Sequence, residues 1–111
     1  MLTNLQHTRG DTLSRVITVN VKADGVTTPY DITGATFTFS IKNSFRDTEY
    51  IFTKEWTNHS NPEDGQTLLF ATATQMEIEL GTYYYDVQME LDGVVTTIFK
   101  GTFEITFDVT E

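Results

Sequence analysis

The most informative stretch of this sequence is YYYDVQMELDGV, which covers residues 83–94. Its odd-numbered residues from Tyr83 to Leu91 are large and mostly apolar, and the residues between them are mostly polar. This alternation has the period of a β-strand with one buried face. The next pair, Asp92-Gly93, favours a two-residue turn of type I′, in which both residues need positive φ. The stretch therefore predicts a long hairpin near the end of the chain.

The second arm of this hairpin changes its pattern part of the way along. If Leu91 pairs with Val94, the even-numbered residues from Val94 to Ile98 face inward. The large residues from Phe103 onward are odd-numbered, so in an unbroken strand they would face outward. One extra residue must be absorbed between the two runs. Gly101 is the expected β-bulge, because glycine tolerates the local distortion that a bulge requires.

Earlier segments predict the remaining strands. Alternating apolar residues favour strands over residues 12–21, 36–42, 50–56 and 66–73. Pro29 lacks a backbone donor and Gly34 permits positive φ, so residues 28–34 are expected to cross between strands. Residues 57–65 have the composition of an exposed loop, and 74–81 that of a short crossing turn. Seven or eight strands separated by turn signals predict an all-β sandwich of two antiparallel sheets.

Composition supports a single domain over residues 1–111. The 39% hydrophobic content, the 13% aromatic content and the 21 threonines favour a folded and extended structure. A net charge of -9 is unsuited to binding nucleic acid or anionic lipid, so neither is an expected partner. The absence of cysteine excludes disulfides, a thiol nucleophile and Cys-ligated metals. The sequence shows neither a signal peptide nor a transmembrane segment.

Catalytic residues are difficult to assemble from this chain. Only His7 and His59 are candidate bases near neutral pH, and no serine lies in a nucleophile elbow. An enzyme would need His59 in a pocket beside Glu63 or Asp64. We therefore expect no enzymatic activity, no catalytic residue, no cofactor and no metal site.

A local motif precedes the long strand. Residues 80–85 have the sequence LGTYYY, which resembles the tyrosine corner of immunoglobulin-like domains, where a Tyr near the start of the penultimate strand bonds to nearby backbone. Tyr83 is the candidate, with Gly81 opening the strand. The alternative is that the three tyrosines are ordinary strand residues. The motif favours the immunoglobulin-like form of the sandwich.

The chain resembles the small immunoglobulin-like domains of tailed-phage virion proteins, in particular the N-terminal domain of the phage baseplate upper protein family. The matching segments are residues 9–12 (RGDT), 29–37 (PYDITGATF), 80–88 (LGTYYYDVQ), 93–103 (GVVTTIFKGTF) and 108–110 (DVT). In that family this domain is followed by further modules, whereas this chain ends at Glu111. Met1 and the predicted last strand favour a stand-alone module over a fragment.

The resemblance implies a structural role in a virion. It implies a protein made in the host cytoplasm and built into a baseplate, tail, neck or capsid-associated part. The implied partners are other virion proteins and further copies of the same chain.

Two groups of residues are candidates for such contacts. Residues 1–9 form a candidate extended arm, with Leu2, Leu5 and His7, that pairs with a sheet edge or reaches a neighbouring subunit. Aromatic side chains beside polar loops form the second group, because interfaces are enriched in them. They are Phe45, Tyr50 and Trp56, and for Trp56 core packing is the favoured alternative.

A carbohydrate-binding or host-surface-binding module is the rival interpretation. Trp56, Tyr30 and Tyr84 would then stack against sugar rings. Aromatic side chains gathered on one outer face would favour this alternative.

Overall fold

The computed structural model describes residues 4–44 and 49–106, and these residues are nearly all in β-structure. The strands are β1 (Leu5–Thr8), β2 (Leu13–Thr18), β3 (Asn20–Ala23), β4 (Val26–Pro29), β5 (Thr36–Lys42), β6 (Phe52–Trp56), β7 (Gln66–Ala71), β8 (Gly81–Leu91) and β9 (Val94–Thr106). A single turn of 3-10 helix, η1 (Pro62–Asp64), precedes β7. Over the described ranges no helix has the length and apolar character needed to cross a bilayer.

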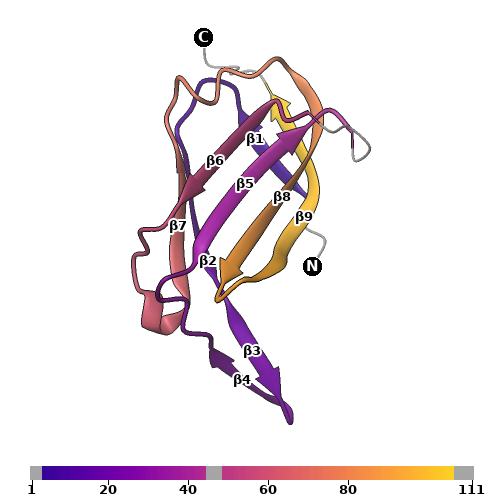
Figure 1. Ribbon diagram of the computed structural model, residues 1–111. Helices are drawn as coiled ribbons and strands as arrows, with labels where there is room; N and C mark the ends of the chain where they lie inside the picture. Colours follow the sequence, from indigo (N-terminus) through magenta and orange to yellow (C-terminus); the bar gives the residue numbers. More distant parts are fainter. Residues whose placement is uncertain (1–3, 45–48, 107–111) are drawn as a thin grey trace.

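The strands form one large sheet and two small ones. The large sheet has the order β1-β9-β8-β5-β6, and β2 pairs with β7 in a separate two-stranded sheet behind it (Figure 1). β3 and β4 form a third ribbon that projects from one end of the molecule (Figure 1). The predicted all-β sandwich is thus observed at the level of its layers. The prediction of only antiparallel sheets was wrong, because β1 runs parallel to β9.

The long hairpin of β8 and β9 is confirmed, with Leu91 opposite Val94. Asp92 and Gly93 have φ values of 54° and 80°, as a type I′ turn requires. The predicted position of the bulge was wrong. The register changes where Val87 pairs with Phe99 and Gln88 with Thr97, so Ile98 is the extra residue. Gly101 instead lies in regular register opposite Tyr85.

The core lies between the large sheet and the β2–β7 sheet. Its buried residues come from both layers and from the crossing segments: Leu13, Ile17, Val19, Ile32, Ala35, Phe37, Phe39, Ile41, Leu69, Ala71, Met76, Ile78, Tyr83, Tyr85, Val87, Met89, Phe103 and Ile105. At its centre the ring of Phe39 lies 5.9 Å from that of Phe103 and 6.0 Å from that of Tyr85. Each such fully buried apolar side chain contributes about 1.5–3 kcal/mol.

The crossing segments are fixed by specific backbone contacts. Pro29 ends β4 and pairs with Asn20 on the exposed ribbon, and Gly34 has a φ of 85° in the turn before β5. Gly65, at a φ of 73°, is the position with least freedom. A Cβ there would meet the carbonyl oxygens of Val19 and Tyr30, the latter at 2.7 Å. Only glycine fits this approach of three chain segments.

The segment between β7 and β8 is a turn, as predicted. Thr72 and Gln75 form a reciprocal cap, in which each backbone N–H donates to the other's side-chain oxygen, at 2.9 and 3.2 Å. Gly81 then opens β8. The Tyr83 hydroxyl donates to the carbonyl oxygen of Glu79 at 2.6 Å, which is the local bond expected of a tyrosine corner. Burial raises the pKa of Tyr83, and the Glu79 carboxylate acts in the same direction.

Candidate interaction surface

The two layers leave two open sides, because β6 and β1 are the terminal strands of the large sheet and β7 and β2 those of the small one. Between β6 and β7 lies a groove of about 380 Å³, which we call the β6–β7 groove. It is lined by Lys54, Trp56, Asn58, His59, Ser60, Leu68 and Phe70. None of these residues is acidic, although the chain has sixteen Asp and Glu residues.

A hydrogen-bonded chain holds two of the groove residues, Trp56 and His59. Trp56 Nε1–H donates to the hydroxyl of Thr67 at 2.8 Å. His59 Nδ1 lies 2.9 Å from the same hydroxyl, and His59 Nε2 lies 2.8 Å from the carbonyl oxygen of Ala35. A carbonyl only accepts, so Nε2 carries the proton and, in the neutral ring, Nδ1 accepts from Thr67. The chain therefore ties β6 and the start of β5 to the buried Thr67 of β7 with each donor and acceptor used.

Aromatic packing supports the same two residues. The Trp56 ring stacks on Phe37 with centroids 5.6 Å apart, and the His59 ring meets Phe37 edge-on at 5.3 Å. Both rings are therefore fixed by the core on one side and line the groove on the other. This position makes His59 a structural residue with both ring nitrogens bonded, and it bonds to neither Glu63 nor Asp64.

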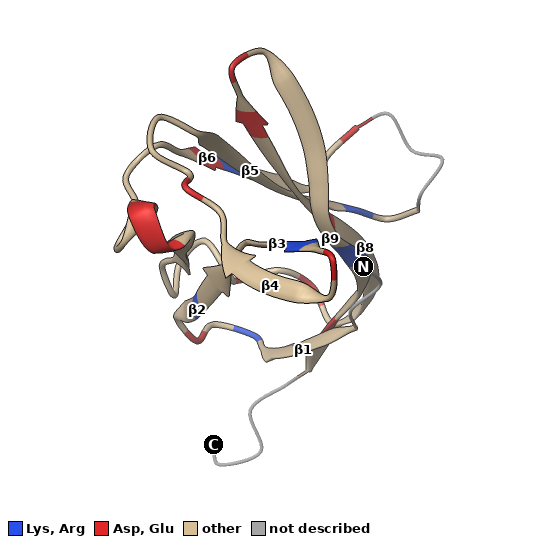
Figure 2. Ribbon diagram, turned by 90° about the horizontal axis from the view of Figure 1, so that it is seen from below, with Lys and Arg blue, Asp and Glu red and all other residues tan. Residues whose placement is uncertain are grey.

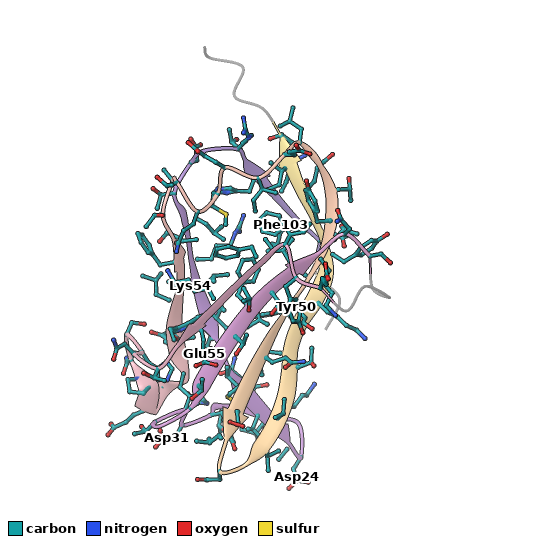
Figure 3. All side chains as sticks on the ribbon, turned by 45° about the horizontal axis from the view of Figure 1, so that its top comes forward. Asp24, Asp31, Tyr50, Lys54, Glu55 and Phe103 are labelled. Carbon is teal, nitrogen blue, oxygen red and sulfur yellow. The ribbon has the colours of Figure 1, made fainter. Side chains whose placement is uncertain are left out.

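Lys54 occupies an unusual position on β6. Its register partner is the buried Phe39, so its side chain starts on the inward face of the sheet, between Phe52 and Trp56. The ammonium group emerges at the groove and lies 5.5 Å from the centre of the Phe70 ring. Figure 3 labels Lys54 on this side of the molecule. An inward-pointing charge on an edge strand is a known protection against edge-to-edge aggregation.

The outer face of the β2–β7 sheet exposes three apolar side chains and lacks acidic residues. Val16 is 65% exposed, and Leu68, its register partner, and Phe70 are 39% and 41% exposed. We call these three residues the β2–β7 patch. Neither β2 nor β7 contains Asp or Glu, whereas η1 and the tip of the β8–β9 hairpin are acidic (Figure 2).

The opposite open side has a smaller groove of about 220 Å³ between β2 and the β1–β9 edge. Leu5, Leu69 and Phe99 contribute apolar surface to it, and Arg15 also lines it. Burial raises the pKa of Tyr85 in this groove, and the Arg15 guanidinium partly opposes that shift. This side therefore also places a basic residue beside an aromatic ring.

A third hollow lies on the outer face of the large sheet and measures about 110 Å³. Asp86 lies there between Lys42 and Lys100, with Ser40 as a register partner. Burial raises the pKa of the Asp86 carboxyl, and Lys42 partly opposes the shift. Among the described residues, no three His, Asp or Glu side chains lie close enough together to hold a metal ion.

Part of the predicted N-terminal arm forms the strand β1. Residues 5–8 pair in parallel with β9, with Leu5 opposite Phe103, so this segment takes the first of its two predicted alternatives. Leu5 packs against the core. His7 Nε2 lies 2.8 Å from the carbonyl oxygen of Asp11, and its ring lies 6.2 Å from that of Phe103. Leu2 lies outside the described residues.

The predicted aromatic contacts are distributed over separate places. Tyr50 is 53% exposed, with the Lys42 ammonium 4.8 Å from its ring centre. Trp56 is half-buried and packs on the core, which was its favoured alternative. Tyr84 lines the hollow on the large sheet rather than the β6–β7 groove, so it forms no common platform with Trp56. Phe45 lies outside the described residues.

Thr67, Phe70 and the structural role of His59 were missed from the sequence. A Thr in an apolar strand has no local signature of burial, and the partners of Thr67 lie 8 and 11 residues away. Lys54 did carry a signal. It shares the parity of Phe52 and Trp56, which places a charge on the inward face of a predicted strand.

No protein-family model matches the chain, and no curated protein matches it.

Proposed function

We propose that this protein is a non-enzymatic structural component of a phage virion, acting as an assembly or attachment module through the surfaces of an immunoglobulin-like sandwich. Its partners are other virion proteins and further copies of the same chain. It is made in the host cytoplasm before it enters the particle. The resemblance of residues 9–12, 29–37, 80–88 and 93–103 to phage baseplate domains is the reason for the virion context.

The strand order supports the immunoglobulin-like part of the proposal. The run β9-β8-β5-β6 has the order G-F-C-C′ of a variable-type sheet, and β2 with β7 has the place of strands B and E. Tyr83 lies near the start of β8, the counterpart of strand F, and bonds back to Glu79 as a corner tyrosine does.

The observation that carries the assembly role is the β2–β7 patch. A protein with a net charge of -9 has one layer, formed by β2 and β7, whose strands lack acids and expose Val16, Leu68 and Phe70. Contiguous apolar surface of this kind marks interaction sites, since it is unfavourable in water. The histidine nearest to it already holds Thr67 and Ala35, which favours a structural over a catalytic role.

The test is the mass of the protein in solution, by size-exclusion chromatography with light scattering over a range of salt concentrations. We expect a discrete oligomer that becomes more populated with salt, because screening weakens the repulsion between chains of charge -9. Phe70→Ser should shift it toward monomer. Val95→Ser is the matched control, because Val95 is 58% exposed at the far hairpin tip. A monomer under all conditions, or equal effects of the two variants, would contradict self-assembly through this patch.

Carbohydrate binding is a second candidate, favoured by the β6–β7 groove. Trp56 and Phe70 line it beside the polar side chains of Asn58 and Ser60, a combination typical of sugar sites. Trp56 is the only tryptophan, so its fluorescence reports directly on the groove. Saturable quenching by a bacterial cell-wall oligosaccharide, lost in Phe70→Ser, would support this function, and unchanged fluorescence would exclude these sugars from the groove.

A further inference from the structure

The β7 strand has a free backbone edge on the groove side. Gln66 is the last residue of β7 whose main chain is bonded on that side, where it exchanges two hydrogen bonds with Asn61, of 3.0 and 3.1 Å. In an antiparallel strand the direction of the N–H and C=O groups alternates with every residue. The main-chain groups of Leu68 and Phe70 therefore point the same way as those of Gln66, toward the groove.

The opposite side of β7 agrees with this assignment. The Val19 N–H donates to the carbonyl oxygen of Gly65 at 2.8 Å. The main-chain N–H and C=O groups of the odd-numbered residues in this segment therefore point toward β2. Leu69 and Arg15 then form a hydrogen-bonded pair, and Leu68 and Val16 a non-hydrogen-bonded pair. Within the described residues, no strand lies beside β7 past Asn61 on the groove side. Two N–H and two C=O groups are thus available in a row.

The side chains around this edge define what fits against it. Leu68 and Phe70 expose apolar surface, and Lys54 supplies a positive charge beside Phe70. The groove has no acidic lining residue, and its volume of about 380 Å³ lies directly along the edge. An extended segment with apolar side chains and an acidic residue matches these features in shape and in charge.

We propose that the free edge of β7 binds an extended segment of a partner polypeptide by strand addition, with its main chain paired to Leu68 and Phe70 and an acidic side chain near Lys54. The partner strand gives the two-stranded β2–β7 sheet a third strand. Strand addition of this kind draws affinity from main-chain bonds and specificity from side-chain pockets. The inference rests on the proposed assembly role and names the site and the chemistry of the partner segment.

The experiment uses the full chain and a synthetic octapeptide of alternating valine and threonine with one glutamate at its centre. Amide hydrogen exchange followed by NMR reports on each residue of β7. Without peptide, the amides of Leu68 and Phe70 should exchange freely, while that of Leu69 is protected by β2. With peptide, Leu68 and Phe70 should become protected. Protection of both before peptide is added, or free exchange of both at millimolar peptide, would overturn the proposal.

Two variants separate main-chain pairing from other binding in the groove. Leu68→Pro removes one N–H from the free edge and leaves the β2 ladder intact, so it should weaken peptide binding about tenfold, the value of one hydrogen bond. Ser14→Pro is the matched control, because Ser14 is the register partner of Phe70 and its N–H points outward from the other edge of the same sheet. It should leave the affinity unchanged. Equal affinities for both variants would show that the peptide does not pair with β7.

The charge and the function are tested separately. Lys54→Met should weaken binding about threefold for the glutamate peptide, as for an exposed ion pair, and not at all for a glutamine version. Sugar that protects no β7 amide but quenches Trp56 would instead assign the groove to carbohydrate. A chain that forms oligomers yet leaves the β7 edge open to exchange would overturn strand addition and retain the assembly role. A monomer that binds the peptide would retain strand addition and overturn self-assembly.

Discussion

The two open sides of this sandwich are closed in different ways. Between β6 and β7, a chain of hydrogen bonds runs from Trp56 through Thr67 to His59 and links the layers beside an open groove. Between β2 and the β1–β9 edge, apolar residues such as Leu5 and Phe99 contact the core. Directional polar contacts fix one geometry, whereas apolar contacts tolerate repacking.

The two sides share one device. Each has a basic residue at an inward position of an edge strand, Lys54 on β6 and Arg15 on β2, and each of these residues lies near an aromatic ring. The β6–β7 side keeps its width because Trp56 and His59 cannot move without losing hydrogen bonds. This difference predicts that substitutions on the β6–β7 side act cooperatively and that those on the β2 side act independently.

The largest effect should come from Trp56→Ala. It removes the stack on Phe37 and the bond to Thr67, so we expect a loss of about 3 kcal/mol in the free energy of unfolding. Urea denaturation followed by circular dichroism measures it. Trp56→Phe keeps an aromatic ring against Phe37 and removes the hydrogen bond to Thr67, so it should lower the free energy of unfolding by only about 1 kcal/mol. Equal losses for the two variants would show that the ring packing has little importance.

On the opposite side, Leu5→Ala should lower the free energy of unfolding by about 2 kcal/mol, because Leu5 is half-buried against the core. The neighbouring exposed residue provides the control. Gln6→Ala removes only a surface hydrogen bond to Glu104 and should change stability little. A larger loss for Gln6→Ala than for Leu5→Ala would contradict apolar closure of this side.

Thr67→Val tests the polar chain without changing the shape of the side chain. It leaves the Trp56 N–H and the His59 Nδ1 without their partner, so we expect a loss of about 1.5 kcal/mol. In a double-mutant cycle with Trp56→Phe the losses should not add, because both remove the same bond. Simple additivity would mean that the bond contributes nothing to stability.

The smallest effect concerns alkaline pH. Burial raises the pKa of Tyr85, so the unfolded chain ionises first and the stability that Tyr85 contributes is lost as pH rises above about 10. Tyr85→Phe should reduce this loss. Arg15→Met should enlarge it, because the guanidinium favours the ionised form. Alkaline unfolding curves of the two variants measure the contrast, and a shift in the same direction for both would refute it.

Local patterns were sufficient for the hairpin turn and for the buried face of β8. Asp92-Gly93 gave the turn, and the parity of Tyr83 to Leu91 gave the buried face. The bulge was misplaced, because parity shows only that one residue is extra between Ile98 and Phe103. Glycine was favoured at that point, but a branched residue, Ile98, takes the position.

Contacts between distant segments were not predictable from these patterns. The hydrogen bonds of His59 to Thr67 and Ala35 depend on how the layers are placed, and a threonine or histidine alone does not specify its partner. The same holds for the parallel pairing of β1, since an alternating segment such as residues 5–8 fits any open edge. Local periodicity determines faces, and tertiary placement determines partners.

The pairing of β1 with β9 has a consequence for biosynthesis. Gln6 and Glu104 bond across 98 positions of the chain, so β1 has no partner until β9 has been made. At roughly 5–20 residues per second, this wait lasts about 5 to 20 s. During that time the nascent chain presents an open strand edge to its neighbours on the same message. The large sheet is therefore completed only once β9 has been made, and β1 waits through that whole interval with its edge open to mispairing.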